Sequence, residues 1–206
     1  MATVLPFQRD GAAAADLSLM KRVAAADKHA QRVLAHRLAA RVRRISQRLL
    51  SNRADADDAS QLALMEILRS AATYKEISTI ERWADRIAVR TVLRHAREQR
   101  KRLWQLGTLI DIEAVGGTPE RAPNPENTPR PVEEYLAELP AARREVLVMK
   151  HSLGYTTEEI AELTDNPVGT VKDRLVAARK QLRKLIVRDM RSWGRGSGSQ
   201  EGSRHD

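Results

Sequence analysis

Basic residues recur at every fourth position along the stretch ERWADRIAVRTVLRHAREQRKR: Arg82, Arg86, Arg90 and Arg94, with Arg97 and Lys101 continuing the row. On a helix, a spacing of four keeps side chains neighbours on one slowly turning face. Like charges in such a row repel one another, and a phosphate backbone would relieve the repulsion by neutralising them. The row therefore predicts contact with nucleic acid. An ordinary solvated basic face is the alternative.

A second basic helix is predicted in TTEEIAELTDNPVGTVKDRLVAARKQLRKLI, which spans residues 156–186. Thr156 and Glu159 have the spacing of a capping box, and Asn166 followed by Pro167 suits the start of the next helix. Apolar residues then follow at intervals of four, three, four and three: Val171, Leu175, Ala178, Leu182 and Leu185. Two helices, a tight turn and a basic second helix are typical of a helix-turn-helix, whose second helix enters the major groove. An amphipathic hairpin with a solvated basic face is the alternative.

Acidic residues gather in ADADDASQLALMEIL, where Asp57 and Asp58 precede Gln61. Carboxylates at a helix N-terminus are stabilised by the helix dipole and can pair with arginines of a partner. A simple capping cluster is the alternative. Three carboxylates, Asp55 included, could also chelate Mg²⁺, but their crowding into one turn is better explained by capping and partner contact.

Residues typical of catalysis are not arranged for it. The five histidines are scattered, and the chain has neither a Gly-rich phosphate loop nor a Ser/His/Asp order that indicates a nucleophile. We therefore predict no enzymatic activity, no catalytic residue, no cofactor and no metal site.

The elements that must hold these residues are predicted to be helices. Ala, Leu, Arg and Glu are abundant, aromatic residues make up only 3% of the chain, and apolar alternation with period two is missing. The stretch GGTPERAPNPENTPRP is too rich in proline to be a helix interior or to bury a core. We predict an all-α fold of two small helical domains, 16–102 and 132–188, joined by a flexible Pro-rich linker, 103–131. A flexible N-terminus, 1–15, and a disordered tail, 189–206, complete the chain.

Charge and composition narrow the class of protein. The formal net charge of +9 and the sequence pI of about 10.3 indicate an anionic partner, either nucleic acid or an anionic membrane surface. The absence of cysteine fits a reducing compartment. The first residues make a poor signal peptide, and no apolar run approaches the length that spans a bilayer. We therefore expect a cytoplasmic protein without membrane insertion.

The C-terminal region resembles that of bacterial extracytoplasmic-function (group IV) sigma factors of RNA polymerase. The resemblance is carried by Leu139-Pro140, Arg144-Glu145, Tyr155, Glu159-Ile160-Ala161, Gly169-Thr170-Val171-Lys172, Arg174-Leu175 and Ala178-Arg179. In that family this domain reads the promoter −35 element. The resemblance implies DNA contacts by Gly169, Thr170, Lys172, Asp173, Arg174, Val176 and Ala177. Family members commonly have serine at the position of Asp173, so the preferred −35 sequence is expected to differ.

The N-terminal region carries two further resemblances to that family. Asp57, Asp58 and Gln61 resemble its polymerase-binding helix, whereas Trp83, Arg86-Ile87-Ala88 and His95 resemble its −10 reading helix. The resemblance implies −10 contacts by Arg82, Arg86, Arg90, Arg94 and Arg97. Many members have asparagine at Arg90 and aspartate at Arg94. The loop 71–78, with Tyr74, is the candidate pocket for a flipped base.

The resemblance implies a sigma factor that binds core RNA polymerase and directs promoter recognition and transcription initiation. Core RNA polymerase, promoter DNA and an anti-sigma factor are the partners it implies. Two other functions remain open: a helix-turn-helix regulator that acts without polymerase, and a helical adaptor that binds only proteins.

Overall fold

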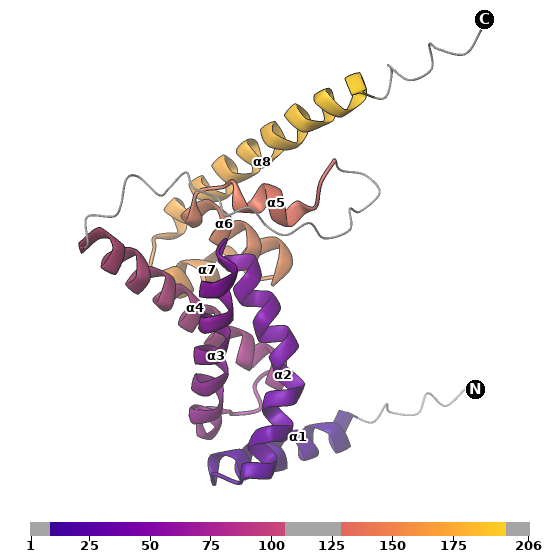
Figure 1. The fold of residues 1–206 in the computed structure, drawn as a ribbon. Helices are drawn as coiled ribbons and strands as arrows, with labels where there is room; N and C mark the ends of the chain where they lie inside the picture. The colour runs from indigo at the N-terminus through magenta and orange to yellow at the C-terminus, as the bar shows by residue number, and fades with distance from the viewer. Residues whose placement is uncertain (1–8, 106–128, 197–206) are drawn as a thin grey trace, which may run out of the picture. The chain divides into compact units, whose positions relative to one another are not determined.

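The structure is a computed structural model that describes residues 9–105 and 129–196, and every regular element among these residues is a helix (Figure 1). The chain divides into two compact units. The first unit comprises Met1–Ser46 and Ala54–Ala96, and the second comprises Gln47–Arg53 and Arg97–Asp206. The predicted all-α fold with two helical units is confirmed.

The first unit contains α1 (Arg9–Ala24), the short 3₁₀ helix η1 (Ala71–Thr73) and the greater part of α2 (Lys28–Leu49), α3 (Arg53–Arg69) and α4 (Ile80–Gln105). Large apolar side chains at three-to-four spacing on α2 are buried: Leu34, Leu38, Val42 and Ile45. On α3 the buried residues are mostly small: Ala56, Ala59, Ser60, Ala63 and Ile67. Small side chains such as these let a helix lie close to its neighbours.

The turn between α1 and α2 is fixed by Asp27. Its carboxylate accepts hydrogen bonds from the backbone N–H groups of His29 (2.8 Å) and Ala30 (3.1 Å) and from the Arg22 guanidinium. The Ala30 amide and the Arg22 side chain lower the pKa of the Asp27 carboxyl below its ordinary value. Asp27 is therefore the N-cap that starts α2.

Helix α1 begins at Arg9, so it includes residues 9–15 of the stretch that the sequence predicts to be flexible. Residues 12–15 are all alanine, the residue type with the highest helix propensity, and this outweighs the cost of Gly11 to the helix. Farther along α1, Met20 and Val23 are buried in the first unit. Residues 1–8 lie outside the described part of the chain.

The second unit contains five further elements: α5 (Val132–Ala137), α6 (Ala141–Leu147), the π-helical turn η2 (Val148–Ser152), α7 (Thr157–Thr164) and α8 (Val168–Gly196). Its largest fully buried side chains are Tyr135, Tyr155, Met149, Ile160 and Leu49. The apolar stripe predicted on α8 faces this core: Val171, Leu175 and Ala178 are buried, and Leu182 and Leu185 are packed at its edge.

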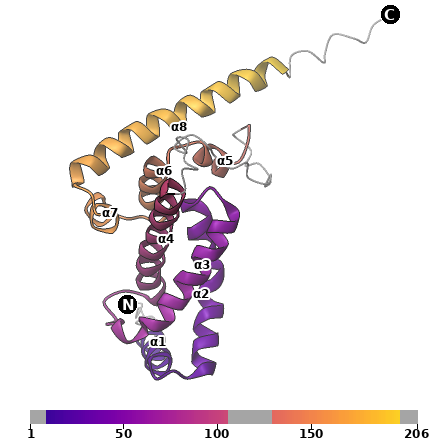
Figure 2. The same cartoon turned by 60° about the vertical axis from the view of Figure 1, so that its left-hand side comes forward.

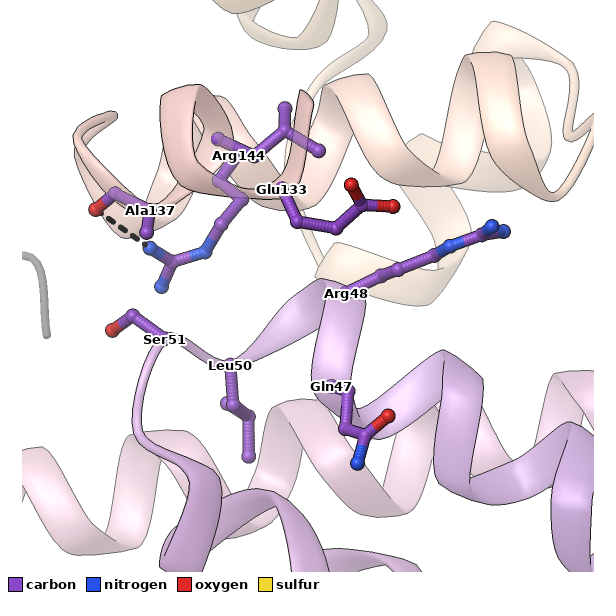
Figure 3. A pocket seen from close by; sticks show the side chains of 8 residues that line it. Gln47, Arg48, Leu50, Ser51, Glu133, Ala137 and Arg144 are labelled. Carbon is purple, nitrogen blue, oxygen red and sulfur yellow. Dashed lines mark hydrogen bonds between the residues drawn. The ribbon is translucent and has the colours of Figure 1, made fainter. Parts of the chain in front are cut away.

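Arg144 of α6 is a buried cation that binds backbone carbonyls. Its Nε donates to the Leu49 carbonyl at 3.0 Å, and longer bonds of 3.5 Å reach the carbonyls of Ala137 and Leu139. Leu49 ends α2, where carbonyl groups lack intrahelical partners, so Arg144 caps that helix. The guanidinium lies in the wall of a small cavity that is also lined by Gln47, Arg48, Leu50, Ser51, Glu133, Leu136 and Ala137 (Figure 3).

Helix α8 continues without a break to Gly196, so it includes residues 189–196 of the stretch that the sequence predicts to be a disordered tail (Figure 2). Asp189 accepts from Arg130 (2.8 Å) and Arg188 (2.9 Å), and Glu138 pairs with the same two arginines. This network ties the helix end to the residues that precede and end α5. Residues 197–206 lie outside the described part.

The predicted domain limits and the structural units do not coincide. The structure places Gln47–Arg53 and Arg97–Gln105 with the second unit, whereas the sequence assigned residues 47–53 and 97–102 to the first domain. Helix α4 also continues to Gln105, past the predicted start of the linker at residue 103. Most of the predicted linker, residues 106–128, lies outside the described residues.

Candidate nucleic-acid interface

The acidic cluster lies at the start of α3, and its members differ in exposure. Asp58 and Gln61 are exposed, whereas Asp57 is half-buried. Leu62 and Met65 follow on the same helix face, and 44% and 47% of their surfaces are exposed. The residues 58, 61, 62 and 65 share one face because they are separated by three, four and seven positions. We call these four residues the α3 face.

Asp57 is engaged within the first unit. Its two carboxylate oxygens accept from Nε (2.9 Å) and NH2 (3.2 Å) of Arg43 on α2. This bidentate ion pair holds α3 against α2. The neighbouring carboxylate of Asp58 is directed to solvent. The structure thus separates the two acids that the sequence treated alike.

The four arginines from Arg82 to Arg94 follow α4 as predicted, but they are not equally exposed. Arg82 and Arg86 are half-buried, and Arg90 and Arg94 are exposed. A spacing of four residues turns the face by about 40° at each step, or about 120° over the row, which explains the gradual change in exposure. Ala88, Thr91 and Val92 are buried as expected, whereas Trp83 and Ile87 are half-buried.

Arg97 differs from the other arginines of the row. It belongs to the second unit, where its NH2 donates to the Thr164 carbonyl at 2.8 Å. The structure therefore does not group Arg97 with Arg82–Arg94. Sequence reasoning also missed Asp85, a buried acid within the row, which accepts two 2.6 Å bonds from Arg41.

The predicted helix-turn-helix consists of α7, a turn at Asp165–Pro167, and α8. Thr156 Oγ1 accepts from the Glu159 N–H at 3.1 Å, and the Glu159 carboxylate accepts from the Thr156 N–H at 2.9 Å, which confirms the capping box. Asp165 ends α7 in the left-handed region, with φ of 55°. Helix α8 begins at Val168, directly after Asn166 and Pro167, and Asn166 does not cap it, because the Asn166 side-chain amide donates to the Thr164 carbonyl.

The residues predicted to read the −35 element lie on the first turns of α8, mostly away from its buried stripe. Gly169, Lys172, Asp173 and Val176 are exposed, Val176 to 59%, and Thr170, Arg174 and Ala177 are half-buried. A Cβ built on Gly169 meets no atom within 4 Å, so the backbone is open to a close approach there. The structure thus brings all seven residues together on one helix start.

The loop 71–78 joins α3 to α4 and is pinned internally. The Tyr74 hydroxyl donates to the Ser78 carbonyl at 2.9 Å, and the Tyr74 ring meets the Trp83 ring edge-on, with centroids 5.7 Å apart. Burial is the largest cause that raises the pKa of the Tyr74 hydroxyl. Tyr74 thus stabilises the loop.

Leu62 and Met65 were missed as surface residues, although the sequence held a signal for them. Alanines at 56, 59 and 63 with Ile67 follow the helical spacing of a buried face, and they place the larger apolar residues outside it.

Within residues 9–105 and 129–196, no cluster of three or more His, Cys, Asp or Glu side chains could hold a metal ion. No helix in those ranges is both long and apolar enough to cross a membrane.

Two family profiles match the chain: Sigma-70 region 2 over residues 34–102, and Sigma-70, region 4 over residues 130–182. The ECF RNA polymerase sigma factor SigM of Mycobacterium tuberculosis is 30% identical over 151 residues, which is 73% of this chain and 70% of that protein. The ECF RNA polymerase sigma-E factor of Haemophilus influenzae is 29% identical over 184 residues, which is 83% of this chain and 95% of that protein.

A solved structure shares the fold. It contains the sigma factor RpoE in complex with the anti-sigma factor NepR from Bartonella quintana, with a TM-score of 0.57 and 21% identity over 74% of this chain and 93% of that chain. A helix-turn-helix in the second unit and exposed arginines on α4 in the first unit are typical of a DNA-binding protein of transcription. Together with the sequence matches, this shows that the chain belongs to the extracytoplasmic-function sigma factors, which bind core RNA polymerase and direct promoter recognition and transcription initiation.

Proposed function

We propose that core RNA polymerase binds the α3 face, formed by Asp58, Gln61, Leu62 and Met65. The observation that carries this proposal is the exposure of two large apolar side chains beside a solvent-directed carboxylate and amide, on a helix whose alanines are buried on the opposite side. Apolar residues rimmed by polar groups are typical of protein interfaces. Asp57 borders the face and, through Arg43, keeps α3 in place.

We propose that promoter DNA contacts α4 and α8. Arg82, Arg86, Arg90 and Arg94 would bind the −10 region, and Arg97 would join them when it leaves the Thr164 carbonyl. The −35 element would be read by Gly169, Thr170, Lys172, Asp173, Arg174, Val176 and Ala177. The open approach to the Gly169 backbone and the positive end of the α8 dipole favour contact with a nucleic-acid backbone.

We assign a separate role to each part of the chain. Residues 16–102 bind core polymerase and the −10 region, residues 132–188 bind the −35 element, and residues 103–131 connect them. Two DNA-binding parts on one chain raise each other's effective concentration on the promoter. The chain performs no covalent chemistry of its own and acts in the cytoplasm. A solved relative is bound to an anti-sigma factor, and we propose a regulator of that class for this chain.

Replacing Asp58 by arginine tests the polymerase surface. Reversal of the charge directed to solvent should weaken binding to core polymerase by about tenfold or more, as judged from interfacial charge reversals. The measurement is the dissociation constant with core polymerase, by fluorescence anisotropy of a labelled chain.

The matched control is Glu133→Arg, which makes the same change of charge at an exposed position on α5. It should leave the affinity for core polymerase unchanged. Equal weakening by both variants would show that net charge, and not the α3 face, governs the affinity, and would overturn the assignment.

A further inference from the structure

The last turns of α8 carry three large apolar side chains that remain exposed. Val187, Met190 and Trp193 expose 37%, 51% and 56% of their surfaces. They are three residues apart along the helix, so each step turns the face by about 60° and all three lie within an arc of about 120°. We call these three residues the α8 end face.

The α8 end face lies beyond the part of the helix that builds the second unit's core. Leu182 and Leu185 pack against that core, and after them α8 extends past α5, α6 and α7 of the same unit (Figures 1 and 2). The Sigma-70, region 4 profile also ends at residue 182. Neither the core nor the matched region therefore explains why large apolar residues stand at this end of the helix.

Cations border the α8 end face. Arg183 lies seven residues before Met190, hence on the same side of the helix, and Arg191 follows Met190 directly. Both arginines are exposed, and neither forms an ion pair with a described residue. The one acid of residues 183–193 is Asp189, which accepts from two arginines and is thereby neutralised. The surroundings of the face are therefore positive, and they favour an anionic partner.

A second copy of this chain and DNA both fit the α8 end face poorly. Two copies of the face would bring arginines of like charge together, which opposes association. About 36 Å of helix separate Trp193 from Gly169 near the start of α8, at roughly 1.5 Å per residue. That length is far more than the width of a major groove, about 12 Å, so DNA that holds the start of α8 leaves its end uncovered.

The surface of a membrane that contains anionic lipids matches both properties of the face. Helices that lie in such a surface have apolar residues, often with tryptophan, on one side and lysine or arginine around them. A tryptophan ring is favoured at the level of the lipid headgroups. The aliphatic stems of arginine can lie on apolar surface while their charged ends reach lipid phosphates.

We propose that the α8 end face binds the surface of membranes rich in anionic lipid. Val187, Met190 and Trp193 enter the headgroup region, and Arg183 and Arg191 pair with lipid phosphates. The contact is peripheral, and it uses residues other than those proposed to read the −35 element. It does not depend on the proposed contacts with polymerase or with promoter DNA.

Flotation of the full chain with lipid vesicles tests the inference. One set of vesicles contains phosphatidylglycerol and phosphatidylethanolamine, and the other contains only phosphatidylcholine. At an ionic strength of about 0.15 M, the chain should float with the first set and stay behind with the second. The double change Met190→Ala with Trp193→Ala should weaken binding to the anionic vesicles by about tenfold, because it removes the apolar surface that lipid would bury.

A charge reversal with a matched control separates the face from the net charge of the chain. Arg191→Glu should weaken binding to anionic vesicles by about tenfold or more, since each cation near such a surface strengthens binding roughly fivefold. Arg32→Glu makes the same change of charge at an exposed position on α2 and should have a much smaller effect. Val33→Ala is the control for the apolar change, because Val33 is an exposed apolar residue of α2, at 43%.

Fluorescence quenching reports whether the apolar residues enter the lipid. Phosphatidylglycerol with brominated acyl chains should quench the tryptophan fluorescence of the unchanged chain. Trp193→Ala should remove most of this quenching, although Trp83 and Trp104 are still present. All the changed residues are exposed, so the variants should keep the free energy of unfolding of the unchanged chain, which urea denaturation checks.

Absence of flotation with the anionic vesicles would overturn the inference. So would equal losses for Arg191→Glu and Arg32→Glu together with unchanged binding by the double alanine variant, because net charge alone would then explain the attraction. Weaker binding of that variant to core polymerase, without any flotation of the unchanged chain, would assign the face to a protein partner and would also overturn the inference.

Discussion

Thr156 is the residue on which the start of α7 depends most directly. Its side chain and that of Glu159 satisfy two backbone N–H groups that the helix leaves without partners. Thr156→Ala should therefore lower the free energy of unfolding by about 1 kcal/mol. Thr157→Ala, one residue into the helix, is the control and should cost less. Equal losses in urea denaturation would show that the capping box adds nothing specific.

Glu145 gives stability an unusual dependence on pH. Burial raises the pKa of its carboxyl above the ordinary 4.5, although Arg100, Arg144, Arg97 and Arg174 act in the opposite direction. Between the ordinary and the raised value, the folded chain holds a proton that the unfolded chain has released. Stability must therefore fall as pH rises through that window and stay lower above it.

The prediction is that Glu145→Gln removes this decline. Urea denaturation of both proteins in steps from pH 4 upward should give a difference that grows with pH and then levels off. Asp27 and Asp189 have lowered pKa values, so their contributions vanish only at more acidic pH and do not mask the effect. Parallel curves for the two proteins would contradict the prediction.

Local contacts could be predicted from the sequence, and distant ones could not. The capping box depends on residues three apart, so its pattern is visible in the chain. The bond from Arg144 to the Leu49 carbonyl joins residues 95 positions apart, and the pairs Arg43–Asp57 and Arg41–Asp85 depend on how α2 packs. An arginine row or an acidic cluster does not reveal which of its members are already paired.

At the scale of elements, α8 combines a buried stripe with exposed positions near its start. Gly169 is one of these positions, and a Cβ there would meet only open space. Gly169→Ala should thus leave the protein as stable as before, or more stable by about 0.5–1 kcal/mol, since alanine favours a helix.

The same change should weaken binding to a −35 duplex, because the added methyl group would occupy the path by which DNA approaches the backbone. The measurements are urea denaturation and an electrophoretic shift with promoter DNA. Gly154→Ala is the informative contrast: Gly154 has a φ of +68°, so alanine there should destabilise the protein. Unchanged DNA affinity for Gly169→Ala would remove Gly169 from the DNA-binding surface.

The elements themselves were predictable where apolar periodicity was strong, and their ends were not. The stripes of α2 and α8 were evident in the sequence, whereas α1 starts earlier and α8 ends later than composition indicated. The extension of α8 depends on Arg130 and Glu138, which precede and follow α5 and carry no local signal for residues 189–196. No buried face of α3 was predicted from the sequence, so the exposed apolar residues of this helix were not identified.

At the scale of the whole molecule, the sequence predicted the family and the presence of two helical units. It did not predict the units' limits, because Gln47–Arg53 belongs to the second unit although it lies between helices of the first. Such an assignment depends on long-range packing around Leu49 and Arg144, which no local pattern records.

The most direct measurement is transcription by purified core polymerase with and without this chain, from a library of genomic promoter fragments, with the start sites mapped. We predict that specific transcripts appear only when the chain is present and that Asp58→Arg lowers their yield when the chain is limiting. DNA binding by the chain without any dependent transcript, at concentrations that saturate core polymerase, would contradict this prediction.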